Sequence, residues 1–357
     1  MMDDNTNGPG PQDHDNSSQM EDINHDDGSS LISPATTSRT GVDLVPFAAR
    51  IAAIKAECKK VLVGQDEILE LILTCILSGG HILLEGVPGV AKTLSAKVLS
   101  RTLDADFARI QFTPDLLPSD IIGTSIFRMD KGKFKFQPGP IFSNVVLIDE
   151  VNRAPAKTQS ALFEVMEEKQ ISYDGTTYPM EYPFVVIATQ NPVEQEGTYR
   201  LPEAQLDRFL MKINLGYPSA QGEVAILRRF KDEVDKPDLT AVSKVLDPAE
   251  LRKLQNVIKD IYVEDQMYTY IANLVRETRQ HPKIYLGGSP RASLAILKTA
   301  KVTAAMMGRD FIIPDDIQYV APHVLHHRII LTPDAEMEGR GAEVILKEIM
   351  AGLDVPR

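Results

Sequence analysis

Residues 82–93 read ILLEGVPGVAKT, a short apolar run that leads into a glycine-bearing loop ending in Lys92-Thr93. The apolar start, Ile82 to Leu84, is typical of a buried strand, and residues Leu94 to Leu103 alternate apolar and polar as a helix would. Proteins use a strand, a glycine-bearing turn and a helix in this order to hold the phosphates of a nucleotide. The stretch therefore predicts a phosphate-binding loop on a parallel α/β sheet.

The residue types in this loop match the chemistry of a polyphosphate. Such a ligand needs backbone N–H groups around its oxygens, a cation, and a hydroxyl that helps to seat Mg²⁺. We expect Gly86 and Gly89 to let the backbone curl, and a helix starting near Ala91 to point its N–H groups at the phosphates. Lys92 then reaches the outer phosphates and Thr93 reaches the metal. The loop predicts binding of ATP with Mg²⁺.

The loop departs from the common pattern G-x-x-x-x-G-K-[ST] at one position. Ala91 stands where the second glycine is usual, and Gly89 lies two places earlier. At average residue usage, the bare spacing arises by chance about once in several chains of this length. An ordinary strand–loop–helix turn remains the alternative for this motif taken alone.

Polar side chains follow two further strand-like runs. VVLIDE (145–150) carries Asp149 and Glu150 at its end, and the run Phe184 to Ala188 is followed by Thr189, Gln190 and Asn191. An acid at this place orders the water shell of Mg²⁺, and a following glutamate can deprotonate the attacking water. We therefore expect Asp149 at the metal, Glu150 as the base, and Asn191 near the water or the terminal phosphate. The alternatives are acids that merely follow a strand, and an asparagine that caps a turn.

Four segments carry a resemblance to a known family. They are FTPDLLPSDIIGT (112–124), GPIFSNVVLIDEVNRAPAKTQSALFEVMEEKQI (139–171), IATQNPVEQEGTYRLPEAQLDRF (187–209) and GSPRA (288–292). From about residue 44 to its C-terminus, the chain resembles the MoxR family of AAA+ ATPases. The loop GVPGVAKT is common in that family, so the alanine at position 91 fits the resemblance.

The resemblance implies a ring, usually a hexamer, with ATP held between neighbouring subunits. Arg208, in LDRF, corresponds to the arginine finger, which reaches the neighbour's γ-phosphate and stabilises charge in the transition state. Arg200, in TYRLPE, is a second candidate for this role. For either arginine, the alternative is a surface salt bridge, which contributes little.

Arg291 has a local rationale as well as a family role. Ser289 can cap a helix, Pro290 suits its first turn, and apolar residues recur at Leu294, Leu297 and Ala300. A cation at a helix start opposes the helix dipole, so a purely stabilising role for Arg291 is less attractive. The resemblance implies that Arg291 is sensor 2, carried by the lid and touching the terminal phosphate. It also implies that Gly64-Gln65 packs beside the adenine.

Together, the motifs and the resemblance give an α/β fold with three parts. Residues 1–43 form an acidic tail that we expect to be disordered, because it has almost no large apolar groups to bury. Residues 44–218 form an AAA+ P-loop core with a parallel sheet and hairpin inserts, and residues 219–357 form a helical lid. The residues predicted to bind the nucleotide are Gly64, Gln65, Gly86, Val87, Gly89, Val90, Ala91, Lys92, Thr93 and Leu94.

Two hairpin signals interrupt the predicted core. One pairs IFRM (126–129) with KFKF (133–136), and the other pairs QISY (170–173) with TTYP (176–179) around Asp174-Gly175. The Asp-Gly dipeptide suits a two-residue type I′ turn. The resemblance implies that such hairpins decorate the face or pore of a ring and contact a client. Two roles are open for Lys131, Lys133 and Lys135: they bind a client, or they only make an exposed hairpin soluble.

Composition and charge limit the class of partner. The chain has 357 residues, 43% of them hydrophobic, and a formal net charge of −12. Nine acidic residues against Arg39 alone give the first 43 residues a net charge of −8, which leaves −4 for the rest. A near-neutral folded part argues against nucleic-acid binding, which normally needs a basic surface. The tail could bind a partner, but its charge favours a solvated arm that increases solubility.

The sequence also predicts the compartment. The start is acidic and polar rather than that of a signal peptide, and no apolar stretch reaches the roughly 18 residues that a membrane span needs. We therefore expect a cytoplasmic protein. Cys58 and Cys75 have no C-x-x-C spacing, so we expect reduced, structural thiols.

The motifs predict hydrolysis of ATP with Mg²⁺, and the resemblance implies that the chain is an AAA+ ring motor that remodels or matures a protein client. The resemblance implies a chaperone-like activity with partners that bear a von Willebrand factor A domain. The alternatives are a metal-chelatase or MCM-like motor subunit of the same clade, and a nonhydrolysing nucleotide-sensing scaffold. A P-loop GTPase is a weaker alternative, because the chain lacks an N-K-x-D base-reading motif.

Overall fold

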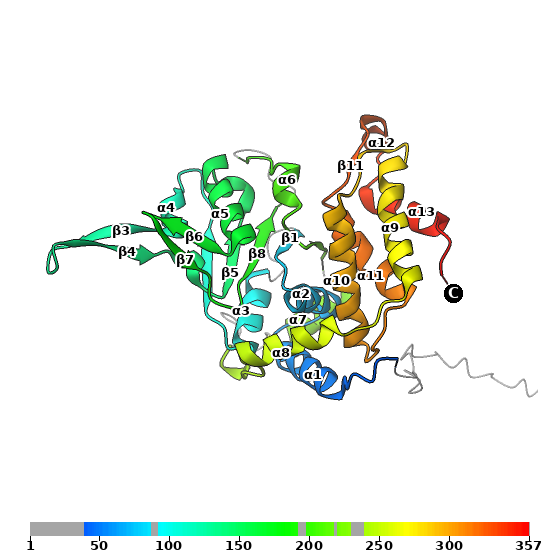
Figure 1. Ribbon diagram of the computed structural model, residues 1–357, viewed down its shortest axis with the longest axis horizontal. Helices are drawn as coiled ribbons and strands as arrows, with labels where there is room; N and C mark the ends of the chain where they lie inside the picture. Colours follow the sequence, from blue (N-terminus) through cyan, green and yellow to red (C-terminus); the bar gives the residue numbers. More distant parts are fainter. Residues whose placement is uncertain (1–38, 87–91, 192–197, 218–219, 230–238, 357) are drawn as a thin grey trace, which may run out of the picture. The chain divides into compact units, whose positions relative to one another are not determined.

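A computed structural model of the chain describes residues 39–86, 92–191, 198–217, 220–229 and 239–356. Its centre is a five-stranded sheet in the order β2-β5-β8-β1-β9, in which every neighbouring pair is parallel (Figure 1). The strands are β1 (Ile82–Gly86), β2 (Phe107–Gln111), β5 (Val145–Asp149), β8 (Val185–Gln190) and β9 (Met211–Leu215). The predicted parallel α/β core is confirmed.

Because the strands are parallel, their carboxyl ends share one edge of the sheet, which we call the carboxyl edge. Gly86, Asp149 and Gln190 end their strands there. At the opposite edge, the amino edge, the N–H of Leu210 donates to the carbonyl of His81 over 2.8 Å. A strand rises about 3.3 Å per residue, so strands of this length separate the two edges by about 15 Å.

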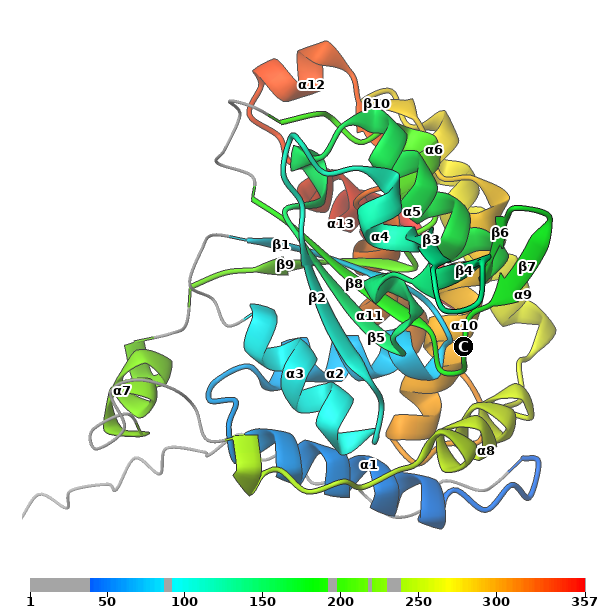
Figure 2. The ribbon, with the colours of Figure 1, turned by 90° about the vertical axis from the view of Figure 1, so that its left-hand side faces the viewer.

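Helices cover both faces of the sheet (Figure 2). One face packs against α1 (Val45–Lys59) and α3 (Lys92–Thr102), and the other packs against α4 (Pro118–Ile122) and α5 (Ala156–Glu168). Successive side chains of a strand point to opposite faces. Ile82 and Leu84 therefore join the first core, whereas Leu83 joins the second. Burial on both faces explains why the central strands β5 and β8 begin as continuous apolar runs.

Two helices precede β1. After α1, the chain turns at Gly64, whose φ is +70°, and α2 (Asp66–Leu77) then leads to β1. Glycine adopts this left-handed backbone without steric cost.

Both predicted hairpins are confirmed. In the first, β3 (Gly123–Arg128) pairs with β4 (Lys133–Pro138) in a register that places Phe127 opposite Phe134, and the pair extends away from the sheet (Figure 1). In the second, β6 (Gln170–Tyr173) pairs with β7 (Thr176–Pro179), and Asp174 and Gly175 turn with φ of 48° and 73°.

The chain is mostly helical after β9, as predicted. Its elements there are α7 (Ala220–Arg229), η3 (Leu239–Ala241), α8 (Pro248–Lys259), α9 (Asp265–Gln280), β10 (Ile284–Leu286), α10 (Pro290–Met306), α11 (Pro314–Leu325), β11 (Ile330–Leu331), α12 (Pro333–Met337) and α13 (Ala342–Gly352). Buried residues of α9, α10 and α11 belong to the same core cluster as α1, α2 and α3. The lid helices and the α/β core thus share buried packing.

Three short elements complete the order of the chain. They are η1 (Pro140–Phe142), η2 (Val151–Arg153) and α6 (Glu203–Leu206). The first two flank β5, and α6 leads toward β9. Through the described ranges, no helix is both long enough and apolar enough to cross a bilayer.

The two cysteines are buried free thiols. Burial raises the pKa of the Cys58 thiol to about 12, and it also raises the pKa of Cys75. Thiols with raised pKa values are poor nucleophiles, which agrees with the structural role expected of them.

Candidate nucleotide site

Lys92 lies at the carboxyl edge, where it bridges two neighbouring strands. It is the first residue of α3, and its Nζ donates to the carbonyl of Gly86 at the end of β1 and to that of Gln190, at 3.3 Å, at the end of β8. Burial lowers the pKa of Lys92, and the carboxylates of Asp149 and Glu150 oppose that effect. The ammonium group therefore sits close to both predicted acids.

The rest of the phosphate loop is described only in part. Val87, Gly89, Val90 and Ala91 lie outside the described residues. Thr93, the second residue of α3, is half-buried, and the half-buried Leu94 packs against the core formed by α1 and α2.

The reason expected for Gly86 needs correction. We expected this glycine to let the loop curl, but it is the last residue of β1 and does not have a positive φ. A Cβ at position 86 would lie 2.6 Å from the carbonyl oxygen of Leu215 and 2.7 Å from its Cβ. The absence of a side chain therefore allows β1 and β9 to pack closely where the loop begins.

Asp149 ends β5 on the same edge as Lys92, and Glu150 directly follows the strand. Asp149 is 8% exposed and accepts a hydrogen bond of 2.5 Å from Arg109 Nε and one of 3.2 Å from Thr189 Oγ1. Glu150 has a φ of 58°, a left-handed conformation that is uncommon for residues other than glycine. Its N–H donates to Thr189 Oγ1 over 3.0 Å, so one hydroxyl links both acids.

The side chain of Glu150 is held as well. Gln111 Nε2 donates to Glu150 Oε2 over 2.7 Å, and Arg153 Nε lies 3.2 Å from the same oxygen. These contacts hold a residue whose backbone has a positive φ. Strained backbone that its surroundings support in this way is common at functional sites. The carboxylate is fixed at the edge of the sheet, which suits a group that orients a water molecule.

Sequence reasoning missed Arg109 and Gln111 as partners of the acids. Both lie on β2, the neighbour of β5, where Arg109 is opposite Leu147 and Gln111 is opposite Asp149. Their spacing of two places them on one face of the strand. The alternating polar residues of FARIQ (107–111) are the signal that could have found them. Thr189 belongs to the polar run after the predicted strand, but we assigned a role only to Asn191 in that run.

Asn191 directly follows β8 and is 8% exposed. In the strand order, β8 lies between β1, which leads to Lys92, and β5, which carries the acids. Asn191 therefore lies between the strand that leads to the predicted phosphate-binding lysine and the strand that ends in the predicted metal ligand.

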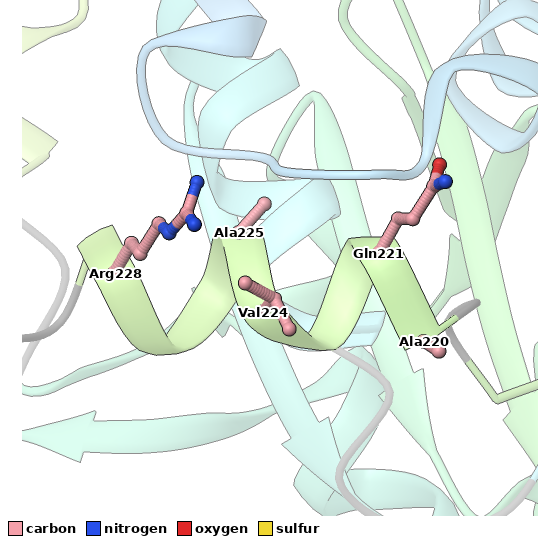
Figure 3. Close-up of a pocket in the computed structure, with 5 residues that line it drawn as sticks. All are labelled: Ala220, Gln221, Val224, Ala225 and Arg228. Carbon is pink, nitrogen blue, oxygen red and sulfur yellow. The ribbon is translucent and has the colours of Figure 1, made fainter.

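Gly64 and Gln65 lie beside α3 and α7. Gln65 Oε1 accepts a hydrogen bond of 3.4 Å from Ser95 Oγ, one turn after Lys92. A Cβ on Gly64 would lie 3.5 Å from the Cα of Gly222 in α7. A cavity of about 560 Å³ runs along α7 and is lined by Ala220, Gln221, Val224, Ala225 and Arg228 (Figure 3).

The predicted arginine finger, Arg208, and the predicted sensor, Arg291, lie together. Arg291 donates to Glu167 Oε1 over 2.9 Å, and Arg208 Nε lies 3.7 Å from Glu167 Oε2. A cavity of about 260 Å³ lies between these groups and is also lined by Lys169 and Lys298. Positive charge from the core and from the lid thus converges on one acidic side chain of α5.

This arginine pair is at the amino edge, away from Lys92. Arg208 lies two residues before Leu210, which bonds to His81 at the start of β1. Glu167 follows Met166, whose carbonyl is 3.1 Å from Nε2 of the same His81. The structure therefore does not bring Arg208 or Arg291 to the phosphate loop of its own chain. The alternative finger, Arg200, is 83% exposed in its side chain and lies 3.7 Å from Glu203.

Two expectations for the start of α10 are wrong. Ser289 occupies the N-cap position, but its hydroxyl makes no capping bond and instead lies 3.2 Å from Asp207 Oδ2. Leu294 is 57% exposed rather than part of an apolar stripe, and it lines the cavity of the arginine pair. Leu297 is half-buried and Ala300 is fully buried, as the pattern predicted.

The residues at the carboxyl edge fit a magnesium-bound nucleotide. Asp149 and Thr93 offer hard oxygen ligands, and Lys92 offers a cation for phosphate. Magnesium in nucleotide sites is usually held by one or two carboxylates together with the phosphates. Across the part of the chain that the structure describes, no group of three or more His, Cys, Asp or Glu side chains is placed to hold a metal by itself.

Comparisons with known proteins agree with this architecture. Residues 81–211 match the family described as "ATPase family associated with various cellular activities (AAA)", and residues 276–349 match the AAA lid domain. A crystal structure of a protein from Cytophaga hutchinsonii, described as a candidate ATPase, superposes with a TM-score of 0.81 at 44% identity. The match covers 88% of this chain and 97% of that one.

The relatives include named members of one family. The chain is 48% identical over 297 residues to the uncharacterized protein YeaC of Bacillus subtilis, covering 83% of this chain and 92% of YeaC. It is 44% identical over 310 residues to chaperone MoxR1 of Mycobacterium tuberculosis, covering 84% and 81%. Over 319 residues it is 31% identical to protein MoxR of Methylorubrum extorquens, covering 82% and 91%. The chain therefore belongs to the MoxR family of AAA+ ATPases.

Proposed function

We propose that this AAA+ ATPase binds ATP with Mg²⁺ at the carboxyl edge and hydrolyses it there. The observation that carries the proposal is the position of Lys92, which spans the ends of β1 and β8 beside the acids of β5. Lys92 binds the outer phosphates, and Thr93 and Asp149 hold the metal. Bound Mg²⁺ neutralises charge on the phosphates. Glu150 takes the proton of the attacking water, and Asn191 helps to position that water.

We also propose that the base of the nucleotide lies between the Gly64 turn and α7. The cavity along α7 has the size of a small-molecule site, and the contact of Gln65 with Ser95 ties the turn to α3. This arrangement supports the role that the family resemblance implies for Gly64 and Gln65. We assign residues 44–218 to the core and residues 219–357 to the helical region. Nucleotide bound there would contact both parts.

Arg208 and Arg291 are proposed to serve the nucleotide of a neighbouring subunit. Strands of β1's length separate the amino edge from the carboxyl edge by about 15 Å, so neither arginine can reach the phosphates of its own chain. A ring, with a hexamer as the expected size, would place the amino edge of one subunit against the carboxyl edge of the next. In that position the arginines stabilise charge as it develops on the γ-phosphate.

We propose that hydrolysis drives chaperone-like remodelling or maturation of a protein client. The Mycobacterium tuberculosis relative is named a chaperone, which supports this class of activity. The β3–β4 hairpin is a suitable contact element, because Phe127, Met129 and Phe134 are 49%, 90% and 70% exposed. Exposed apolar groups of this kind bind other proteins. A partner with a von Willebrand factor A domain is part of the same proposal.

The substitution Glu150→Gln tests the proposal. It keeps the size of the side chain and its bond to Gln111 but removes the base, so ATP should bind with nearly unchanged affinity while phosphate release falls at least a hundredfold. Calorimetry and a phosphate-release assay measure the two quantities. Glu336→Gln, at an exposed position of α12 in the helical region, is the matched control. Phosphate release at the wild-type rate would remove Glu150 from the role of base.

A further inference from the structure

Arg328 is a buried cation outside the nucleotide site. Its side chain is 4% exposed, and its Nε lies 2.7 Å from Asp207 Oδ1. Its other N–H groups donate to the carbonyls of Asp207, Phe209, Leu210 and Val324, over 3.1, 2.6, 3.1 and 2.5 Å. These contacts use the full set of donors that a guanidinium offers.

These contacts converge on the segment that carries Arg208. Asp207 and Phe209 flank Arg208 directly, and Arg328 follows α11 of the lid. His327, the neighbour of Arg328, adds a contact of 3.0 Å between its Nε2 and the carbonyl of Phe209. The lid therefore holds both sides of Arg208 through the backbone, while the side chain of Arg208 stays outside the network.

Asp207 also connects this segment to the helix that carries Arg291. Ser289 Oγ lies 3.2 Å from Asp207 Oδ2, and Ser289 precedes the first residue of α10. One carboxylate thus joins the end of α11 to the start of α10. Arg208 is adjacent to this carboxylate in the chain, and Arg291 lies two residues after Ser289.

We propose that Asp207 and Arg328 are positioning residues that hold Arg208 and Arg291 as one unit, so that movement of the lid displaces both arginines together. The inference rests on the proposed function, in which the two arginines serve a neighbouring subunit. Arg328 is buried and Asp207 is engaged on both oxygens, so neither touches the nucleotide. Asp207 and Arg328 affect hydrolysis only by fixing the positions of Arg208 and Arg291.

The energetics favour a positioning role over a surface ion pair. A buried guanidinium is costly unless every donor is satisfied, so the segment 207–210 has little freedom to move independently of Arg328. A displacement of about 1 Å in a catalytic group can reduce a rate about a hundredfold. Lysine has only three donors on a flexible stem, so it cannot reproduce this set of bonds.

A second buried ion pair in the lid offers a matched control. Arg309 donates to both oxygens of Asp316 over 2.8 and 2.6 Å, and the side chains are 15% and 3% exposed. The side-chain bonds of this pair stay within residues 309–316 and do not include the segment next to Arg208. Loss of this pair should lower stability without changing how the arginines are held.

The test uses rings mixed from two inactive variants of the full chain. Lys92→Ala subunits keep their arginines but lack a functional phosphate loop, and Arg208→Ala subunits have the reverse defect. Asp207→Asn and Arg328→Lys are each measured alone and then mixed with either reference variant. The readouts are kcat for ATP hydrolysis, the Kd for ATP, and the thermal midpoint of unfolding.

We expect Asp207→Asn and Arg328→Lys to lower kcat roughly tenfold to a hundredfold while the Kd for ATP changes less than about twofold. Mixing with Lys92→Ala should restore turnover, because that variant supplies intact arginines. Mixing with Arg208→Ala should not restore it. Arg309→Lys should lower the unfolding midpoint and keep its kcat. Asp207→Asn carries the test if Arg328→Lys does not fold, because Asp207 is only partly buried.

Two outcomes overturn the inference. One is a wild-type kcat in Asp207→Asn, and the other is rescue of Asp207→Asn by Arg208→Ala, which would place its defect in the phosphate loop. A different result contradicts the proposed function itself: no turnover in the reference mixture of Lys92→Ala with Arg208→Ala. In that case the arginines do not act on a neighbour, and the inference built on them falls too.

Discussion

Thr189 Oγ1 lies 3.2 Å from Asp149 Oδ1, and the hydroxyl that donates this bond also accepts the N–H of Glu150 over 3.0 Å. A single side chain of β8 therefore fixes both Asp149, which ends β5, and Glu150, which follows it. Since β8 also contributes the Gln190 carbonyl to Lys92, this strand links the groups proposed to bind phosphate, metal and water.

Thr189→Val should impair hydrolysis without preventing ATP binding. Valine has nearly the same shape but leaves the N–H of Glu150 without its acceptor, which costs about 1–3 kcal/mol of stability. We expect kcat to fall about tenfold, because the Glu150 carboxylate loses its fixed orientation. Steady-state kinetics and urea unfolding measure the two effects. Thr189→Ser keeps the hydroxyl and should behave like the wild type; equal kcat values for valine and serine would contradict the linking role.

Gly86→Ala should destabilise the junction between β1 and the phosphate loop. The added methyl would meet the Leu215 carbonyl at 2.6 Å, so one of the two strands has to shift. We expect a loss of about 1–3 kcal/mol in the free energy of unfolding, together with weaker ATP binding. Gly216→Ala is the control, because a Cβ there meets nothing within 4 Å. Similar urea midpoints for the two variants would show that the close approach has no energetic effect.

Lys212→Met should leave the carboxylate of Glu85 without its ion-pair partner, next to the nucleotide site. Lys212 Nζ lies 2.8 Å from Glu85 Oε2, and the side chains are 13% and 20% exposed. Breaking this mostly buried pair should cost about 1–3 kcal/mol, less than for a fully buried pair. The double variant Glu85→Gln, Lys212→Met should recover much of that loss. Lys59→Met, in an exposed pair, should show no comparable loss, and additive effects in the double variant would argue against the pairing.

Stability should decrease in mild acid, in part because of His81. Its Nδ1 accepts the Val186 N–H over 3.0 Å and its Nε2 donates to the Met166 carbonyl over 3.1 Å, so both nitrogens are used by the neutral ring. Burial lowers the pKa of His81 from 6.5 to about 4. The unfolded chain therefore binds a proton that the folded chain excludes, and the contribution of His81 is complete above about pH 6.5.

As the pH falls from about 6.5 to about 4, this contribution should be lost, up to about 3 kcal/mol. His81→Gln keeps a donor for Met166 but cannot titrate. The variant should be less stable than the wild type at pH 7, and the difference should shrink toward pH 4. Denaturant unfolding at several pH values measures it. Parallel curves for the two proteins would exclude His81 as a source of the pH dependence.

The sequence predicted those parts of the fold that local patterns encode. Val145 to Ile148 form a buried strand because their apolar run is continuous, and Asp174-Gly175 forms a turn because its backbone conformation suits those residues. Lys92 and the acids were placed at one edge because parallel strands bring their carboxyl ends together. These inferences needed only neighbouring residues and the period of the pattern.

Other parts depend on contacts between distant segments, which no local pattern marks. The close approach of Gly86 to Leu215, the bond of Ser289 to Asp207 and the burial of Arg328 appear only once the strands and the lid are packed. The separation of Arg208 from its own phosphate loop has the same origin. It follows from the parallel pairing of β1 with β9, which a linear motif does not contain.

The placement of Lys92 and Arg208 on opposite edges of one sheet has a consequence for assembly. A contact that joins unlike surfaces is head-to-tail, and such contacts either close into a ring or continue as an open filament. In the head-to-tail assembly proposed above, an isolated chain would hold half of two different reaction centres and a complete copy of neither. Specific activity per chain should then fall on dilution, so the concentration of the protein itself would control turnover.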